Sequence, residues 1–295
     1  MSDYSIWILE YARVEEQPAE AIYSGYYAQG ETFYFPFTFM LLSGGGKNIL
    51  VDCGIDFSQQ KKRDMADGFG VTKTQGPAEV LSAIGFKPED IDAIILTHAH
   101  WDHIGGIEVF PNATTYLQTQ EIELWRSLLG EPSSFGPLRA AVDERDIDEA
   151  EARVAAGSMI LIDGAMDDVF PGITVWPDRW GHSFASQLVL VESQTSAGVD
   201  KRIITGDAIY STHNLTGVPG AEHFIPNTKW AIGGPYAVMK TYQRIMDYVQ
   251  GDMNKVLIPH DRESWDRFPS GITAAGQHVA EVRLASGDHT RLDKL

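Results

Sequence analysis

The stretch Thr97–His103 reads T-H-A-H-W-D-H and places three histidines and one aspartate within six positions. It follows the apolar run I-D-A-I-I-L at 91–96, which is typical of a buried strand, and it leads into I-G-G at 104–106. Imidazole and carboxylate groups are ligands that borderline divalent metals prefer. A strand that ends in such a cluster places these groups at the rim of a sheet, where a substrate can reach them. We therefore predict a catalytic metal site here, rather than a polar loop with scattered histidines.

The composition of the chain is that of a globular protein with a sizeable core. Of its 295 residues, 43% are hydrophobic and 22% are charged, and no stretch reads as a linker or a repeat, so we expect one domain over residues 1–295. No apolar run approaches the roughly 20 residues that cross a bilayer, and the start M-S-D-Y-S-I-W does not read as a signal peptide. The single cysteine, Cys53, excludes an intrachain disulfide and fits a reducing compartment. These observations predict a soluble, cytoplasmic protein.

The charge of the chain narrows the range of partners. A formal net charge of −18 repels nucleic acid and anionic membranes, so we expect a small-molecule substrate and no nucleic-acid or membrane partner. Much of the acid lies in residues 143–149, D-E-R-D-I-D-E, which we interpret as the solvated face of a helix.

Hydrophobic periodicity predicts an alternation of strands and helices along the chain. Strands are expected at 34–42, 48–51, 114–117, 159–162, 173–176, 187–191, 202–205 and, as the last one, 255–258. Helices are expected at 77–84, 118–129, 138–156 and 235–250. The first two strands flank three glycines at 44–46 and read as a hairpin. Strands in two halves, each with its own helices, predict an α/β fold, a four-layer αββα sandwich of two packed mixed sheets with helices on the outer faces.

Three isolated side chains at the ends of later strands extend the candidate metal site. His182 precedes the strand at 187, Asp207 follows the strand at 202, and His260 follows the strand at 255, each beside glycine or proline. Taken alone, a single histidine is usually a surface or core residue, and Gly-Asp is usually a turn. Together with the opening motif, however, they supply five histidines and two aspartates, enough for two metals that share one carboxylate.

With these residues the chain resembles the metallo-β-lactamase superfamily, whose mark is H-x-H-x-D-H followed by a distant histidine, an aspartate and a final histidine. The resemblance implies a first metal held by His98, His100 and His182, a second held by Asp102, His103 and His260, and Asp207 as the bridge. It also implies that Asp52, in L-V-D-C-G, orients a ligand histidine by accepting its other N–H, and that Cys53 is a small buried side chain.

The implied chemistry is hydrolysis. Two divalent ions, with Zn²⁺ expected and Mn²⁺ or Fe²⁺ as alternatives that also suit the ligands, can hold a bridging hydroxide at neutral pH that attacks a carbonyl carbon. Asp102 could then carry the proton to the leaving group. Oxygen-reducing and nitric-oxide-reducing members of the family carry Glu at the position of His100 and need a flavodoxin-like domain, and single-metal lactamases lose one ligand. This chain keeps the full set.

Further details resemble the lactonase branch that contains N-acyl-homoserine lactonases and 4-pyridoxolactonase. Tyr210 stands three residues after Asp207, where that branch places a tyrosine that binds or polarises the substrate carbonyl, and His260-Asp261 matches its closing pair. The alternative for Tyr210 is a core or rim aromatic. One departure is that the stretch around His182 reads G-H-S-F-A-S and lacks the second histidine of G-H-T-P-G-H.

The remaining features leave the substrate open. Aromatic residues that could wall a pocket for a ring-bearing or acyl substrate, or simply belong to the core, are Tyr23, Tyr26, Tyr27, Phe33, Trp101, Trp180 and Phe184. We expect a lactonase; the alternatives are a thioester, amide or phosphodiester hydrolase, or a metal-binding protein without turnover. His213 and His223 are assigned no role; they follow Tyr210 closely and could line the pocket, but we expect them at the surface. Close relatives are often homodimers, although the sequence contains no interface signal.

Overall fold

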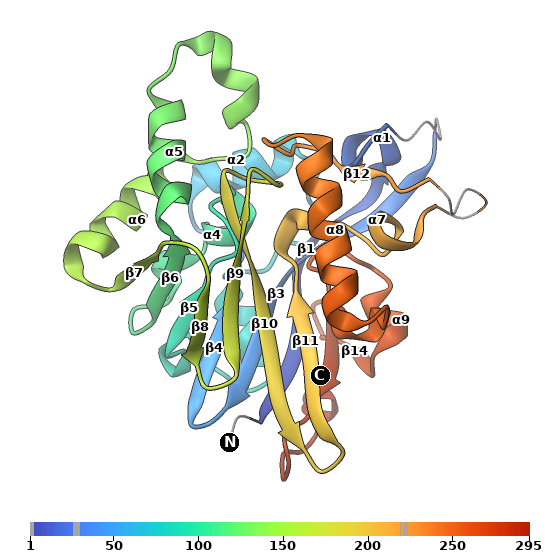
Figure 1. Cartoon of the computed structure of the whole chain (residues 1–295). Coiled ribbons are helices and arrows are strands. Elements are labelled where there is room, and N and C mark those ends of the chain that lie inside the picture. Colours follow the sequence, from blue (N-terminus) through green and yellow to red (C-terminus); the bar gives the residue numbers. More distant parts are fainter. Residues whose placement is uncertain (1–2, 26–29, 219, 221–223) are drawn as a thin grey trace.

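The computed structural model describes residues 3–25, 30–218, 220 and 224–295, and its chain is arranged around two β-sheets (Figure 1). In this part of the chain the larger sheet has eight strands in the order β14-β15-β1-β3-β4-β5-β6-β7. Their bounds are β1 Tyr4–Pro18, β3 Thr32–Gly44, β4 Lys47–Val51, β5 Ala93–Ile95, β6 Thr114–Gln118, β7 Met159–Ile162, β14 Ser270–Ile272 and β15 His278–Arg283. The sheet is mixed, because β4 to β7 pair in parallel and the other neighbours pair antiparallel.

The second sheet packs against the first, and a short two-stranded ribbon lies apart from both. Among the described residues the second sheet has five strands in the order β13-β11-β10-β9-β8, and β12 pairs with β2. Their bounds are β2 Tyr23–Ser24, β8 Met166–Phe170, β9 Ile173–Arg179, β10 Ala185–Thr195, β11 Gly198–Ile204, β12 Asn227–Thr228 and β13 Val256–Leu257.

Alternating side chains on the strands produce the layers. On β1, Ile6 and Ile8 face the second sheet, whereas Trp7 and Leu9 face the helices outside the first sheet. The same alternation on β10 sends Val189 and Val191 into the space between the sheets, and Leu188 and Leu190 outward onto α8 (Pro235–Val249). Because side chains point to opposite faces at every step of a strand, each sheet is apolar on both faces and must be covered on both.

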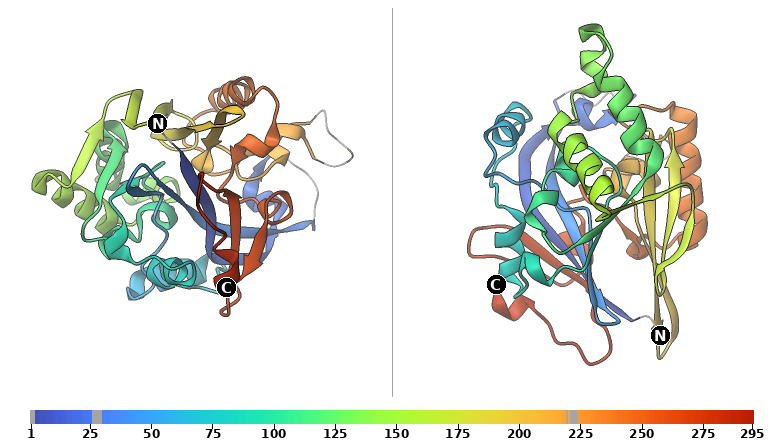
Figure 2. Two further views of the ribbon diagram at one scale, coloured as in Figure 1. Left: turned by 90° about the horizontal axis from the view of Figure 1, so that it is seen from below. Right: turned by 90° about the vertical axis from the view of Figure 1, so that its left-hand side faces the viewer.

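Helices cover the two outer faces, which completes the four-layer αββα arrangement seen in Figure 2. The helix α8 covers the second sheet, while α2 to α6 cover the first. The helices are α1 Ala19–Ile22, α2 Gln60–Gly68, α3 Pro77–Ala83, α4 Trp101–Ile104, α5 Thr119–Leu129, α6 Glu144–Ala156, α7 His213–Thr216, α8 and α9 Ser264–Arg267. No helix in the described part of the chain has both the length and the apolar character that a membrane crossing requires. The predicted α/β class and layering are confirmed.

Most of the predicted elements are present, and two predictions were wrong. The hairpin of β3 and β4 and the helices α3, α5 and α8 lie where the periodicity predicts them. The helix expected over 138–156 begins only at Glu144, because residues 133–139 form a 3₁₀ segment that contains Pro137. The strand expected at 255–258 is not the last one, because β14 and β15 follow it and extend the first sheet.

The acidic stretch 143–149 is only partly a solvated face, which corrects the sequence prediction. Asp143 and Asp146 are buried at the N-terminus of α6, and Lys62 of α2 is fully buried against them. The Lys62 ammonium forms an ion pair with Asp146, and its Nζ lies 3.9 Å from Asp143 Oδ2. A buried carboxylate is tolerated only with such a partner. Because this partner lies on another helix, the periodicity of α6 alone could not reveal the pair.

Candidate metal centre

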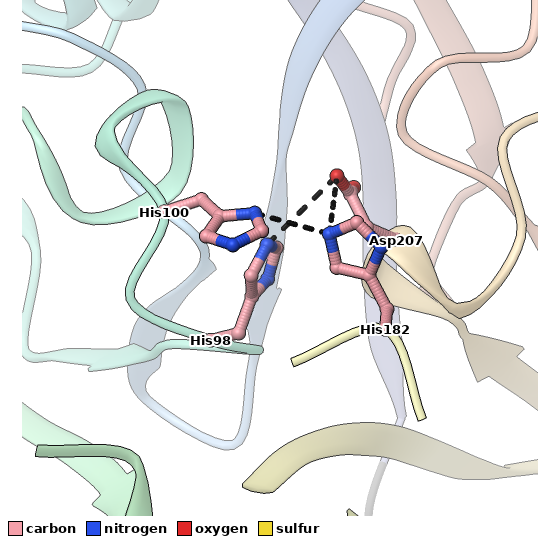
Figure 3. Close-up of side chains that lie close together, drawn as sticks. All are labelled: His98, His100, His182 and Asp207. Carbon is pink, nitrogen blue, oxygen red and sulfur yellow. Dashed lines mark hydrogen bonds and ion pairs between the residues drawn. The ribbon is translucent and has the colours of Figure 1, made fainter. Parts of the chain in front are cut away.

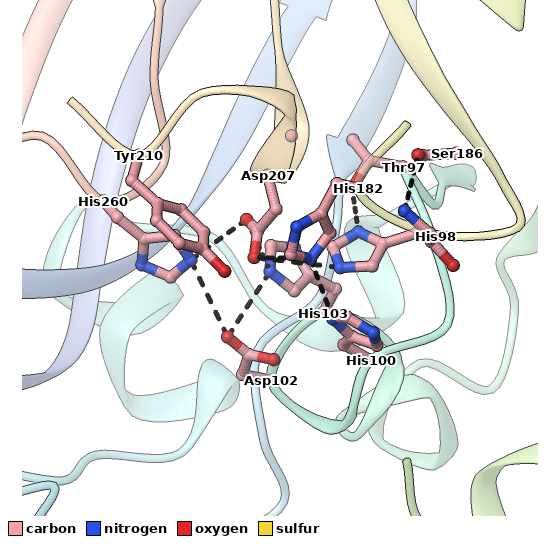
Figure 4. A network of polar contacts seen from close by, with 12 residues as sticks. Thr97, His98, His100, Asp102, His103, His182, Ser186, Asp207, Tyr210 and His260 are labelled. Carbon is pink, nitrogen blue, oxygen red and sulfur yellow. Dashed lines mark hydrogen bonds and ion pairs between the residues drawn. The ribbon is translucent and has the colours of Figure 1, made fainter. Parts of the chain in front are cut away.

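Four loops at one edge of the two sheets bring the predicted ligand side chains together. Residues 97–103 follow β5, Asp207 follows β11 and His260 follows β13, while His182 precedes β10. Because β11 and β13 pair in parallel, their carboxyl ends meet at the same edge, and the antiparallel β10 begins there. Figure 4 shows all seven side chains converging from these loops.

The first group consists of His98, His100, His182 and Asp207 (Figure 3). The Nε2 atom of His182 lies 3.0 Å from Nδ1 of His100 and 3.4 Å from Oδ2 of Asp207. The Nε2 atom of His98 lies 3.8 Å from the same Asp207 oxygen. One potential ligand atom from each of these four residues lies within 4.8 Å of all the others, a spacing compatible with a shared cation.

The second group consists of Asp102, His103, Asp207 and His260, so that Asp207 belongs to both groups. The Nε2 atoms of His103 and His260 lie 3.0 Å and 3.1 Å from Oδ1 of Asp207. They lie 3.4 Å and 3.7 Å from Oδ2 of Asp102. Asp207 therefore turns one oxygen toward each group, which is the arrangement expected of a bridging carboxylate (Figure 4).

The ligand atoms that these groups offer fit divalent metal ions. His98 Nε2, His103 Nε2 and Asp207 Oδ1 are buried and have no hydrogen-bond partner, although they face one another across the cluster. Unpaired buried polar atoms are costly, so three of them at one place indicate a missing partner. Imidazole nitrogen and carboxylate oxygen in sets of four suit Zn²⁺, Mn²⁺ or Fe²⁺.

The electrostatics of the two groups favour neutral ligands in one and a bound cation in the other. Burial lowers the pKa of His98 well below 6.5, that of His100 to about 3 and that of His182 to about 4, so the first group offers neutral imidazoles. Burial also acts to lower the pKa of His103, but the carboxylates of Asp207 and Asp102 raise it well above 6.5. The same two carboxylates that favour a proton on His103 also favour a metal cation beside it.

Asp52 orients His103 of the second group through a hydrogen bond. It directly follows β4 and has a φ of 62°. This left-handed region is sparsely populated for residues other than glycine, and such residues are frequent at functional sites. Its Oδ2 accepts a hydrogen bond from Nδ1 of His103 at 2.8 Å, and its Oδ1 accepts one from the backbone N–H of Thr97 at 2.7 Å. The structure therefore places Asp52 where the resemblance implies it, with the Nε2 of His103 turned toward the cluster.

Two further contacts fix this edge. The Nδ1 of His260 donates to the Pro36 carbonyl at 2.7 Å, which turns its Nε2 toward Asp207, and its ring stacks on Phe35 with centroids 4.4 Å apart. Gly206 brings its backbone against Thr97, because a Cβ at this glycine would lie 2.7 Å from the Thr97 Cβ. The glycine before Asp207 is therefore required for the loops to meet.

A functional candidate that sequence reasoning missed is Glu121, on α5. Its buried carboxylate accepts hydrogen bonds from the backbone N–H of Ala99, at 3.0 Å, and of Ala185, at 2.8 Å. Burial raises its pKa, and the hydrogen bonds that it accepts oppose that rise. The available signal was a glutamate at a core-facing position of the predicted helix 118–129, but this does not show which loops it meets.

An apolar pocket opens over the ligand groups. Among the described residues its walls are formed by Val14, Gln17, Ala21, Ile22, Phe35, Phe37, Phe69, Trp101, Ala141, Tyr210 and Trp230. The ligands that border it are His100, Asp102, Asp207 and His260. The predicted catalytic side chains Asp102 and Tyr210 thus both border this pocket. The Tyr210 hydroxyl donates to the backbone carbonyl of Lys229 at 3.1 Å.

The other predicted aromatic residues divide between core and rim. Trp101 is buried and stacks on Phe69, which reaches the surface, with ring centroids 5.4 Å apart. Tyr23 belongs to the core, whereas Trp180 is half exposed. Phe33 and Phe184 pack against the core. Tyr26 and Tyr27 lie outside the described residues.

The two histidines without an assigned role have different outcomes. His213 is half buried rather than at the surface, and its Nδ1 lies 3.4 Å from the Tyr23 hydroxyl. It borders a second cavity that shares Phe35, Tyr210 and His260 with the pocket over the ligands. His223 lies outside the described residues, so its expected surface position stays a prediction.

Comparison with known proteins places this geometry in a family. The chain is 24% identical over 255 residues to "N-acyl homoserine lactonase AttM" of Rhizobium radiobacter, covering 81% of this chain and 87% of that one. It is 24% identical over 242 residues to "N-acyl homoserine lactonase AiiA" of Bacillus thuringiensis subsp. kurstaki, covering 79% and 84%. Both relatives are named as lactonases.

Solved structures show the same fold. A quorum-quenching N-acyl homoserine lactone lactonase matches with a TM-score of 0.65 at 21% identity, over 90% of this chain and 95% of that one. AidC, described as a dizinc quorum-quenching lactonase, matches with a TM-score of 0.64 at 16% identity, over 98% and 99%. The family model described as "Metallo-beta-lactamase superfamily" matches residues 35–276. With this match over most of its length, the chain belongs to the metallo-β-lactamase superfamily.

Proposed function

We propose that this protein is a dinuclear metal-dependent hydrolase that opens lactones, with two Zn²⁺ ions held by the seven residues of the two ligand groups. The observation that carries the proposal is that Asp207 belongs to both groups, with one oxygen turned toward each, at the floor of an apolar pocket. We further propose that the whole chain, residues 1–295, acts as one domain, and that it works in the cytoplasm.

Different protein residues have different roles around the bond that is hydrolysed. When bound, a pair of such ions supplies a Lewis acid and lowers the pKa of a water from 15.7 to about 7. The imidazoles of the first group stay neutral through burial and are available as ligands without losing a proton. Asp102 turns Oδ2 toward His103 and His260 and also borders the pocket, so it can hold a proton for the leaving oxygen of the opened ring.

Tyr210 is the proposed contact for the substrate carbonyl or for the oxygen of the opened ring. Its ring packs edge-on against His260, with centroids 5.7 Å apart, and its side chain is almost fully buried at the wall of the pocket. The hydroxyl group donates its hydrogen bond to the backbone carbonyl of Lys229, so the O–H must rotate away from that carbonyl before it can donate to a substrate. Tyr210→Phe should lower kcat/KM about tenfold, the value of one net hydrogen bond.

The pocket favours a neutral substrate with an apolar arm. Its walls are aromatic and aliphatic, and Gln17 adds one uncharged amide beside the metal ligands. A net charge of −18 disfavours anionic substrates at a distance. The relatives are named N-acyl homoserine lactonases, whose substrate class has this combination of a lactone, an amide and an acyl chain. We therefore propose lactones with an acyl or aromatic substituent.

The test combines metal quantitation with a substrate panel on the full-length protein. We expect two zinc ions per chain and turnover of N-hexanoyl homoserine lactone well above that of S-acyl thioesters, nitrocefin and bis-p-nitrophenyl phosphate. One ion or fewer in fully active enzyme would refute the dinuclear centre. Preferred turnover of a thioester, amide or phosphodiester would keep the centre and replace the lactone, and two bound ions without any turnover would favour a binding protein.

A further inference from the structure

The histidines of the two ligand groups are held in different ways. In the second group the rings themselves are fixed, because Nδ1 of His103 donates to Asp52 and Nδ1 of His260 donates to the Pro36 carbonyl. In the first group, Nδ1 of His98 lies 3.0 Å from the hydroxyl of its neighbour Thr97, but Nδ1 of His182 is buried without a hydrogen-bond partner. A ring without an outer partner keeps its orientation only if the backbone that carries it is fixed.

The backbone of the first group is fixed by Glu121. Ala99, whose N–H donates to Glu121 Oε1, stands between His98 and His100 in the chain. The Ser183 hydroxyl, next to His182, donates to the same oxygen, and the Ala185 N–H donates to Oε2. One carboxylate therefore joins the loop after β5 to the loop before β10, which together carry the three histidines of the group.

A fourth hydrogen bond to Glu121 extends this effect to a ligand ring. The indole Nε1 of Trp125, one turn further along α5, donates to Glu121 Oε1 at 2.8 Å. The Trp125 side chain is fully buried, and its ring packs against the imidazole of His100 with centroids 5.5 Å apart. Glu121 thus fixes the aromatic surface against which His100 rests.

We propose that Glu121 is a positioning residue for the first metal ion, one that sets the relative placement of the two loops carrying His98, His100 and His182. The inference rests on the proposed two-metal centre but not on the identity of the substrate. An ionised carboxylate suits this position, because both backbone amides and the indole can only donate hydrogen bonds. Glu121 also lies in the first turn of α5, where the helix dipole stabilises a negative charge.

The proposal predicts an effect on one ion only. Glu121→Gln keeps the shape of the side chain but turns an NH₂ group toward at least one backbone N–H, which leaves a loop without its acceptor. Loss of such outer contacts typically costs 10–100-fold in metal affinity. The first ion should therefore bind about 10–100-fold more weakly, whereas the second, held through Asp52 and Pro36, should bind as before.

The experiment separates the two ions with reference variants of the full chain. His260→Ala should leave only the first group able to bind tightly, and His182→Ala only the second. Zn²⁺ affinity is measured by competition with a chromogenic chelator, with and without Glu121→Gln in each background. We expect the 10–100-fold weakening in the His260→Ala background and less than threefold change in the His182→Ala background.

Matched controls separate positioning from general stability. Ile122→Ala removes a buried side chain from the same helix without touching the ligand loops, so it should lower the thermal midpoint and leave both zinc affinities unchanged. If Glu121→Gln does not fold, Ser183→Ala removes one donor and should weaken the first ion alone, by a smaller factor. Unchanged affinity of the first ion, or equal weakening of both ions, would overturn the inference. Fewer than two ions on the wild-type chain would instead overturn the dinuclear proposal.

Discussion

Two clusters of buried aspartates in this molecule offset the cost of burying negative charge with different partners. At the N-terminus of α6, Asp143 and Asp146 are paired with Lys61 and the fully buried Lys62. At the edge of the two sheets, Asp102 and Asp207 face imidazoles instead. Lysine carries its own positive charge, whereas the neutral imidazoles of His98, His100 and His182 offer only lone pairs. The charges of the first cluster are thus balanced by protein side chains, although Asp143 Oδ2 and Asp146 Oδ2 accept no hydrogen bond. In the second cluster, bound cations would supply most of that balance.

This difference shows how the same residue type serves two purposes. A buried carboxylate needs a nearby positive charge, and its source decides whether the cluster is structural or functional. The lysine cluster joins α2 to α6 and contributes to stability. Both clusters contain buried polar atoms without a hydrogen-bond partner. Only in the imidazole cluster do these atoms include ring nitrogens whose lone pairs bound ions could take up, which would remove the cost in stability.

Removal of metal should produce the largest difference between the two clusters, because only the imidazole cluster depends on bound ions. Dialysis against a chelator is expected to abolish lactone hydrolysis and to lower the thermal midpoint, because the ions bind the folded chain and not the unfolded one. Added Zn²⁺ should restore both. Activity assays and calorimetry of the same samples check this, and full activity in metal-free protein would contradict the comparison.

Replacing the shared carboxylate should have the next largest effect. Asp207→Ala removes a ligand from both groups, so we expect loss of at least one of two ions and a fall in kcat/KM of about a thousandfold, equivalent to several kcal/mol of transition-state stabilisation. Metal analysis and steady-state kinetics measure these quantities. Two ions retained with near-normal turnover would show that Asp207 does not bridge.

Removing the buried ammonium should affect stability and leave the metal site intact. Lys62→Met leaves Asp146 buried without its partner, which should lower the free energy of unfolding by about 3–5 kcal/mol. The control is Lys201→Met, which breaks the exposed pair with Glu192 and should cost at most about 1 kcal/mol. Urea unfolding measures both. Loss of a metal ion from folded Lys62→Met would show that the two clusters are coupled.

The smallest effect concerns the pH dependence of stability. Burial raises the pKa of Asp146 from 3.8 to about 6, even though Lys62 acts to lower it. Between about pH 4 and pH 6 Asp146 therefore holds a proton in the native chain that it releases in the unfolded chain, and its contribution to the free energy of unfolding falls as the pH rises. Asp146→Asn should make this slope less steep in metal-free protein, as measured by urea unfolding at pH 4, 5 and 6. An identical slope in both proteins would mean that Asp146 is not a source of this dependence.

Particular residues show how far the sequence could be used alone. The motif at 97–103 and the strand-end positions of His182, Asp207 and His260 predicted which side chains meet once the family resemblance was added. Strand pairing accounts for Asp207 and His260, because β11 and β13 are parallel and bring their carboxyl ends to one edge. The assignment of these residues to two ions stays a prediction. The error at 138–156 arose because helical periodicity continues through a segment in which Pro137 and a 3₁₀ turn separate two elements.

Local sequence patterns were enough to predict the layered fold and the chemical type of the site: apolar residues alternate at every second position, and side chains of ligand type form a dense cluster. Which acids are buried, and which partner each one contacts, became visible only in the folded chain. Asp146 finds Lys62 across 84 positions, and Glu121 finds Ala185 across 64. Such long-range pairing depends on how the helices pack on the sheets, and no local pattern encodes it.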